Sequence, residues 1–334
     1  MTKILVTRAY PGTLDVPGAE IVVARDGAYF SHEELLDTVR VHAPMDAIMT
    51  VAYDRVDDSF LDAAGPQLKG VCQYAVGYDN IDVDACNARG VVVTNSPDGV
   101  TEGTADMAWL LMMAAGRRLT EAGRYARSDG YVTNGQLGMR DFIGADFTGA
   151  TLLIVGAGRI GFATAMRSIG WGMRVQYVAR SPHYEFELAP LHATKVDLDI
   201  GLRNADFVSV HTPLTDETRH LINAERLALM KPSAVLVNTA RGPVIDEEAL
   251  VQALKAGLIG GAGLDVYEHE PEVHPELKTL DNVVLTPHIG SASRGSRLMT
   301  TDIVSANLRA VLAGDTPPNE VRPADRTETR LLRD

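Results

Sequence analysis

The sequence predicts an α/β protein with two open parallel sheets, each covered by helices. The first observation is length, because 334 residues exceed what one hydrophobic core usually serves. The second is a pair of series in which apolar, β-branched runs alternate with helix-like patterns, one in the first hundred residues and one after about residue 150. The third is a Gly-rich, polar segment between the two series, from SDGYVTNGQ to FIGADFTG, which we interpret as a linking arm.

In the first series, Ser31 is the expected cap of a helix over 31–42, because Glu34 follows three residues later as in a capping box. A long apolar stretch that begins near Thr101 predicts a buried helix. The expected strands of this series are KILVTRA (3–9), EIVVA (20–24), AIMTV (47–51), LKGVCQYA (68–75) and VVVTNS (91–96).

The second series shows the same alternation and ends in a helix expected from Ser293 to Ala313. The tail beyond Gly314 is charged and contains proline, so we expect it to be loose. The expected strands are 151–155, 174–179, 206–212, 234–239, 261–266 and 282–287, and the expected helices are 158–170, one near 200–205, 223–230 and 246–257.

The charge balance excludes some partners. A formal net charge of -13 repels nucleic acids and anionic membranes, so neither is an expected partner. The chain contains no run of eighteen apolar residues, and its first residues, MTKILVTRAY, do not resemble a targeting segment, so we expect a cytoplasmic protein. Cys72 and Cys86 form no CxxC pair, which favours two inert thiols in a reducing compartment, and we expect no metal.

The cofactor signal is a GxGxxG motif, Gly156, Gly158 and Gly161, between an apolar strand pattern and a helix pattern. Gly156 permits a tight turn, Gly158 lets the backbone approach a pyrophosphate, and Gly161 lets the helix pack on the strand. The amides of Arg159 and Ile160 then face the anion at the helix N-terminus. An ordinary Gly-rich turn is the alternative, but the flanking strand and helix favour a dinucleotide site.

The end of the next strand indicates which dinucleotide is bound. NAD enzymes place an Asp or Glu there for the ribose hydroxyls, whereas this chain reads Val178-Ala179-Arg180-Ser181. A guanidinium and a hydroxyl can bind a 2′-phosphate, so NADP (as NADPH) is preferred and NAD remains possible. Alternatively, Arg180 is a solvated surface residue.

Three candidate catalytic residues follow predicted strands of the second series: Arg241, Glu270 and His288. Reduction of a 2-oxo acid needs a cation for the carboxylate and carbonyl, and an acid for the developing alkoxide. Arg241 and His288 suit these tasks, and a carboxylate at Glu270 favours the charged imidazole. Taken singly, each has a structural alternative: a capping arginine, a solvated glutamate or a packed histidine.

Seven motifs across nearly the whole chain resemble the D-isomer-specific 2-hydroxyacid dehydrogenase family, most closely its glyoxylate reductases, with hydroxypyruvate reductases close by. The motifs are QYAVGYDNID, GTADMAWLLM, GAGRIG, HTPLTDETRHLIN, NTARGPVIDEEAL, GAGLDVYEHEP and NVVLTPHIGSAS. The resemblance implies that the family's arginine, glutamate and histidine fall on Arg241, Glu270 and His288. It also implies that the amides of Val76 and Gly77 hold the substrate carboxylate. The implied or expected cofactor contacts beyond the glycine motif are Thr104, Arg159, Ile160, Arg180, Ser181, His211, Pro213, Thr239, Ala240, Arg241, Asp265, His288 and Gly290.

The resemblance further implies two Rossmann-like or flavodoxin-like doubly wound domains with a cleft between them. A discontinuous substrate domain would comprise 1–99 and 287–334, and the NAD(P)-binding domain 100–286. An arm at about 120–146 would join two copies in a homodimer.

The expected activity is NADPH-preferring reduction of a small 2-oxo acid, glyoxylate or hydroxypyruvate. Two departures from the family pattern leave a bulkier 2-oxo acid open: Val51 and Ala52 stand where leucines are expected, and Leu137 and Met139 lie where tryptophans and a proline are common. A phosphorylated substrate is disfavoured, because only Arg55 supplies a cation near that pocket. A dinucleotide-sensing, corepressor-like binding protein is a further, disfavoured alternative.

Overall fold

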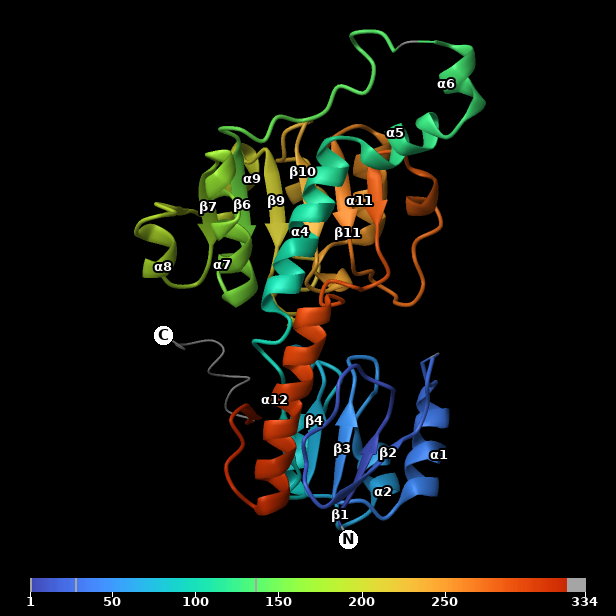
Figure 1. Cartoon of the computed structure of the whole chain (residues 1–334). Coiled ribbons are helices and arrows are strands. Elements are labelled where there is room, and N and C mark those ends of the chain that lie inside the picture. The colour runs from blue at the N-terminus through green and yellow to red at the C-terminus, as the bar shows by residue number, and fades with distance from the viewer. Residues whose placement is uncertain (1, 28, 136, 323–334) are drawn as a thin grey trace. The chain divides into compact units, whose positions relative to one another are not determined.

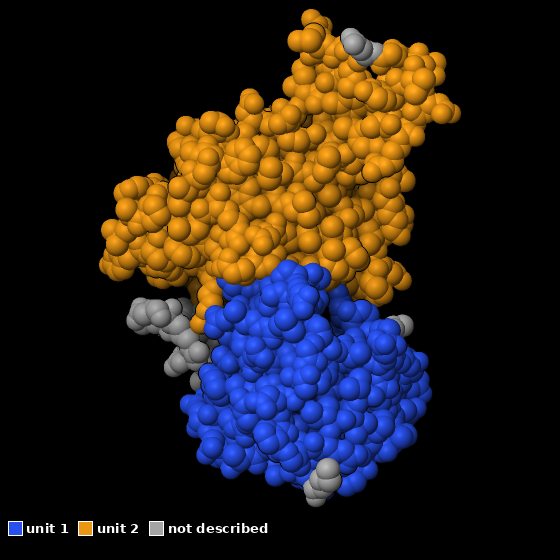
Figure 2. Space-filling view, viewed as in Figure 1, with its two compact units in different colours: residues 1–101, 291–334 blue, residues 102–290 orange. Residues whose placement is uncertain are grey.

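The computed structural model describes residues 2–27, 29–135 and 137–322. The chain folds into two compact units, one of residues 1–101 and 291–334 and the other of residues 102–290, which Figure 2 colours separately. Each unit is an α/β structure with a mostly parallel sheet, as the sequence predicts. None of the described helices has the length and apolar character needed to span a membrane.

Unit 1 holds a six-stranded sheet in the order β13-β5-β4-β3-β1-β2. Its described pairings are parallel except that of β13 with β5. Val304 and Leu308 of α12 pack on one face, and Leu35 of α1 and Phe60 of α2 pack on the other. The elements are β1 (Thr2–Val6), β2 (Ala19–Val23), α1 (His32–His42), β3 (Ala47–Thr50), α2 (Asp58–Ala64), β4 (Gly70–Gln73), α3 (Val83–Ala88), β5 (Val92–Thr94), α12 (Arg294–Ala313) and β13 (Glu320–Val321).

Local predictions for unit 1 are confirmed at both helices that the sequence singled out. Ser31 and Glu34 form the expected capping box, in which each side chain accepts a hydrogen bond from the other's main-chain amide. Ser293 caps α12, which ends before Gly314. The expectation of a loose tail beyond Gly314 is wrong for residues 320–321, which form β13, and its last part lies outside the described residues.

Unit 2 holds a seven-stranded sheet in the order β12-β11-β10-β9-β6-β7-β8, with parallel pairing throughout its described strands. The chain order reverses between β6 and β9, which is the switch point where open α/β sheets bind ligands. The strands are β6 (Thr151–Val155), β7 (Arg174–Val178), β8 (Thr194–Lys195), β9 (Phe207–Val210), β10 (Val235–Asn238), β11 (Gly261–Leu264) and β12 (Val283–Leu285).

Helices cover both faces of this sheet (Figure 1). Leu111 and Met112 of α4 pack on one face, and Leu202 of α9 and Leu250 of α11 pack on the other. The helices are α4 (Thr101–Gly116), α5 (Leu119–Ala126), α6 (Asp129–Thr133), α7 (Arg159–Met166), η1 (Ile169–Trp171), α8 (Tyr184–Glu187), α9 (Leu198–Asn204), α10 (Ala224–Leu227), η2 (Gly242–Val244), α11 (Glu247–Lys255) and η3 (Leu277–Thr279).

The arm contains α5 and α6, neither of which has a buried residue. Figure 1 shows the green segment projecting beyond the end of the unit 2 sheet. Several large apolar side chains of the arm are exposed to solvent, among them Val132 at 85%, Met139 at 98% and Ile143 at 66%.

Candidate active site

The three candidate catalytic residues lie in loops that follow neighbouring strands of unit 2. Arg241 follows β10, Glu270 follows β11 and His288 follows β12, and these strands are adjacent and parallel. Their carboxyl ends therefore meet at one edge of the sheet. Glu270 Oε2 lies 2.8 Å from His288 Nδ1, with 15% and 27% of the two side chains exposed. The structure thus brings the predicted carboxylate and imidazole into direct contact.

The turn that carries His288 is strained and is held by Asp265. His288 has a φ of +53°, in the left-handed region, and its amide donates to the Asp265 carbonyl oxygen at 2.8 Å. The buried Asp265 carboxylate accepts hydrogen bonds from the amides of Ile289 (2.9 Å) and Gly290 (2.7 Å) and from Thr286 Oγ1 (2.6 Å). Burial raises the pKa of Asp265, and these hydrogen bonds partly offset the rise.

A second turn holds Arg241. The Asn238 side chain is buried at the end of β10, where its Oδ1 accepts from the Ala240 amide at 3.0 Å and its Nδ2 donates to the Arg241 carbonyl oxygen at 2.8 Å. Arg241 Nη1 donates to the Ala240 carbonyl oxygen at 2.8 Å. Asn238 therefore fixes the backbone from which the guanidinium extends, a role that our sequence analysis missed.

The Arg241 turn packs directly on the loop that carries Glu270. A Cβ built on Gly242 would lie 1.9 Å from the carbonyl carbon of Tyr267, so no larger residue fits there without movement of the main chain. The Tyr267 amide in turn donates to Glu270 Oε1 at 2.9 Å. Backbone contacts therefore connect the Arg241 turn with the Glu270 carboxylate.

The glycine motif has the expected geometry at the switch point. Gly156 follows β6 with a φ of +104°, and a Cβ there would lie 2.8 Å from His211. A Cβ on Gly161 would lie 2.2 Å from the Gly156 carbonyl oxygen, so helix and strand pack closely. Gly158 is the N-cap of α7, and a Cβ there would meet nothing within 4 Å. The amides of Arg159 and Ile160 start this helix.

Other expected cofactor contacts gather around this edge of unit 2. His211 follows β9 with Nε2 2.9 Å from Ser209 Oγ, and burial lowers the pKa of His211 to about 3, which keeps the ring neutral. Thr104 lies within 3.5 Å of the Cβ position of Gly290. The hydroxyls of Thr212 and Thr239 are buried without a hydrogen-bond partner. Such hydroxyls, with the open space at Gly158, fit a bound ligand that carries phosphates and hydroxyls.

Arg180 and Ser181 lie just after β7 and are exposed to solvent. The residue between them and the strand is Ala179, and no Asp or Glu stands among residues 179–182. The Glu187 carboxylate, further along, accepts a hydrogen bond from Tyr177 at 2.6 Å.

Val76 and Gly77 belong to unit 1, in the loop after β4. The Val76 carbonyl oxygen accepts from Asn95 Nδ2 at 2.8 Å, and the Gly77 carbonyl oxygen accepts from Gln73 Nε2 at 3.2 Å. These side chains fix the loop by its carbonyl groups. Sequence reasoning did not find Gln73 or Asn95, although polar residues at strand ends were the available signal.

Comparisons with known proteins support the resemblance. The family model described as "D-isomer specific 2-hydroxyacid dehydrogenase, NAD binding domain" matches residues 109–290. The chain is 48% identical over 323 residues to a glyoxylate reductase of Thermococcus onnurineus, covering 96% of this chain and 95% of that protein.

Solved structures also resemble this chain over nearly its whole length. The TT0316 protein from Thermus thermophilus superposes with a TM-score of 0.86 at 43% identity, covering 96% of this chain and 100% of that one. The NADPH-dependent glyoxylate/hydroxypyruvate reductase of Sinorhizobium meliloti, in complex with NADP and malonate, gives a TM-score of 0.79 at 33% identity, covering 96% of each chain.

Proposed function

We propose, because the chain belongs to the D-isomer specific 2-hydroxyacid dehydrogenase family, that this NAD(P)-dependent enzyme reduces glyoxylate or hydroxypyruvate with NADPH as the preferred cofactor. Reduction of a 2-oxo acid is the activity that the relatives and the fold support. The observation that supports the choice of catalytic residues is the 2.8 Å contact of Glu270 with His288. These residues follow β11 and β12, and the Arg241 turn follows the adjacent strand β10.

In this proposal Arg241 binds the carboxylate and polarises the carbonyl group of the 2-oxo acid, and the amides of Val76 and Gly77 hold its carboxylate. His288 donates a proton from its ring to the oxygen on which negative charge develops. Glu270 orients the imidazole through Nδ1 and stabilises its charged form, which leaves Nε2 as the donating atom. The nicotinamide cofactor supplies the hydride when it is bound.

The residues present fit a dinucleotide. Gly156, Gly158 and Gly161 allow close approach to the pyrophosphate, and the amides of Arg159 and Ile160 donate to it. Arg180 and Ser181 bind the 2′-phosphate of NADP, since no carboxylate stands at the end of β7 to repel it. The remaining contacts that we propose are Thr104, His211, Pro213, Thr239, Ala240, Arg241, Asp265, His288 and Gly290.

The function is tested by following NADPH and NADH oxidation with glyoxylate, hydroxypyruvate, pyruvate and bulkier 2-oxo acids. We expect His288→Ala to lose most of kcat with little change in cofactor affinity, and Arg241→Ala to lose substrate binding as well. Wild-type turnover by either variant would refute the assignment. Higher kcat/KM for a bulky acid would favour the alternative substrate, which the small Val51 and Ala52 side chains suggest.

The cofactor preference has its own test. We expect Arg180→Ala to weaken NADPH binding roughly tenfold or more, as loss of a charged hydrogen bond does, and to leave NADH nearly unchanged. Equal weakening of both cofactors would argue against a 2′-phosphate site.

We also propose that unit 1 binds the substrate, that unit 2 binds the cofactor, and that two copies form a homodimer through the arm at 120–146. The exposed apolar side chains of the arm support this assembly, since an interface would remove them from water. Sedimentation should show a dimer that Val132→Asp together with Met139→Asp dissociates. A monomer in the wild type would contradict the proposal.

A further inference from the structure

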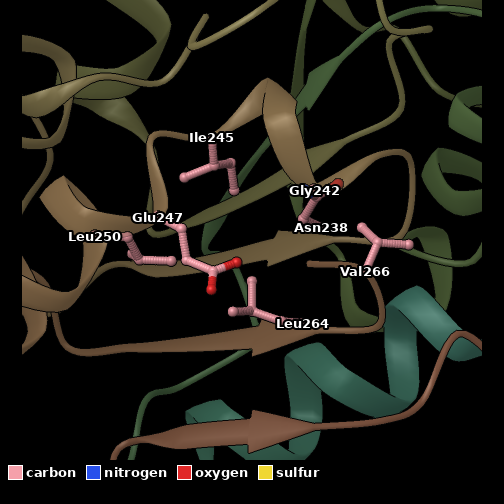
Figure 3. A pocket seen from close by; sticks show the side chains of 7 residues that line it. All are labelled: Asn238, Gly242, Ile245, Glu247, Leu250, Leu264 and Val266. Carbon is pink, nitrogen blue, oxygen red and sulfur yellow. The ribbon is translucent and has the colours of Figure 1, made fainter. Parts of the chain in front are cut away.

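One buried carboxylate holds both ends of the loop that carries Glu270. Glu247, the first residue of α11, is 7% exposed. Its Oε2 accepts from the Glu268 amide at 2.9 Å, and its Oε1 accepts from the His274 amide at 3.1 Å. In Figure 3 this carboxylate points into a small cavity that Asn238 and Gly242 also line. In the sequence, Glu270 lies between Glu268 and His274, the two residues whose amides donate to Glu247.

Glu268 also accepts a hydrogen bond from the main chain of Glu247, so the two residues are joined in both directions. Glu268 Oε2 accepts from the Glu247 amide at 3.1 Å, and Glu268 Oε1 lies 2.6 Å from His220 Nε2. Two carboxylates therefore tie the start of α11 to the loop through main-chain hydrogen bonds. Other titratable groups at this loop include Tyr267, His269, Glu270, Glu272 and His274 within it and Asp265, His288 and Arg241 beside it. Glu248, on α11, has its Oε2 3.1 Å from His274 Nε2.

Removing a carboxylate from water is costly unless hydrogen bonds compensate it, so burial of Glu247 is sustained by the two amides that it accepts from. The geometry needs an acceptor at both oxygens. Glutamine offers one acceptor and one donor, and its amide group would face an N–H group on one side. Aspartate keeps the charge but is one methylene shorter, so it reaches one amide at most.

We propose that Glu247 is a positioning residue for the reaction, which fixes the loop so that the Glu270 carboxylate meets His288. This inference rests on the proposed function, because it assumes that the Glu270–His288 pair supplies the proton. Glu247 acts through Glu270 and does not itself contact the substrate.

The test compares Glu247→Gln with Glu248→Gln as a matched control, since the neighbouring Glu248 side chain is 67% exposed. We expect Glu247→Gln to lower kcat roughly ten- to hundredfold, as small displacements of catalytic groups do, with little change in NADPH affinity. KM for the 2-oxo acid should stay within about twofold of the wild-type value, because Glu247 contacts the loop and not the substrate. Glu248→Gln should keep the wild-type kcat and KM.

A double-mutant cycle separates positioning from simple stabilisation. If Glu247 acts through Glu270, Glu247→Gln should change kcat by less than about twofold in a Glu270→Gln background. Full additivity, or a lowered Tm with an unchanged kcat, would refute the inference. If Glu247→Gln fails to fold, Glu247→Asp is measured in its place, and it should show the same loss of kcat with little change in KM; a wild-type kcat would refute the inference. A wild-type kcat in Glu270→Gln itself would instead refute the proposed function.

Discussion

Gly242→Ala tests whether contact between two loops sets the geometry of the site. The added methyl group would lie 1.9 Å from the Tyr267 carbonyl carbon, about 1.5 Å closer than ordinary van der Waals contact at 3.4 Å. The obstacle is main chain, which cannot rotate away, so the Tyr267–Glu268 peptide and the loop behind it must move. Glu270 is then displaced from His288, with which it now makes a 2.8 Å contact.

A misplacement of about 1 Å can cost roughly 100-fold in rate, which corresponds to about 2.7 kcal/mol in the activation barrier. We therefore expect Gly242→Ala to lower kcat at least 100-fold and to reduce stability by about 1–3 kcal/mol through overpacking. Steady-state rates, NADPH titration and urea unfolding measure these effects. Gly170→Ala is the control, because an added methyl there meets nothing within 4 Å. Near-wild-type kcat in a folded Gly242→Ala protein would refute the reasoning.

Two further predictions concern unit 2. Asn238→Ala should lower kcat/KM and destabilise the protein by about 1–3 kcal/mol, because the Ala240 amide loses its acceptor and the Arg241 carbonyl oxygen loses the hydrogen bond from Nδ2; unchanged kinetics would show that Asn238 does not hold Arg241. Partial burial alone would raise the pKa of Asp206, but its hydrogen bonds, chiefly from Lys231, hold that pKa below its usual value. The pair therefore stabilises the fold above about pH 4, and this stabilisation is lost as pH falls through the lowered pKa. Lys231→Met should lower Tm at pH 7 by a small amount that shrinks toward pH 3, and a difference independent of pH would exclude the pair as its cause.

Strands β3, β4, β6 and β10 were predictable because they are buried on both faces, so most of their residues are apolar. Helices α2 and α3 were not predicted, since seven and six residues are too short for a clear 3.6-residue period. Their capping residues Asp57 and Asp82 were the available signal. Strand β13 depends on pairing with β5, more than two hundred residues earlier, which no local pattern encodes.

The candidate site was predictable where a residue type combines with a strand end, as for Arg241 and His288. The residues that hold them were not found, because Asn238 and Glu247 are defined by the main-chain groups they bind rather than by reactive chemistry. The sequence resemblance assigned Asp265 to the cofactor, whereas its observed hydrogen bonds go to the turn of His288. A cofactor contact at Asp265 therefore remains a proposal.

In the acidic segment DVYEHEPE, only the fold distinguishes which carboxylate contacts the catalytic imidazole. It places four carboxylates within eight residues, and residue type alone makes each a plausible partner for an imidazole. Asp265 binds the amides of residues 289 and 290, and Glu268 binds the Glu247 amide and His220. Glu270 is the carboxylate of this segment that lies against His288 Nδ1. The other acids of the segment cannot replace it without giving up main-chain hydrogen bonds or crossing the loop, so substitution of Glu268 or Asp265 should act through the loop and not through proton donation.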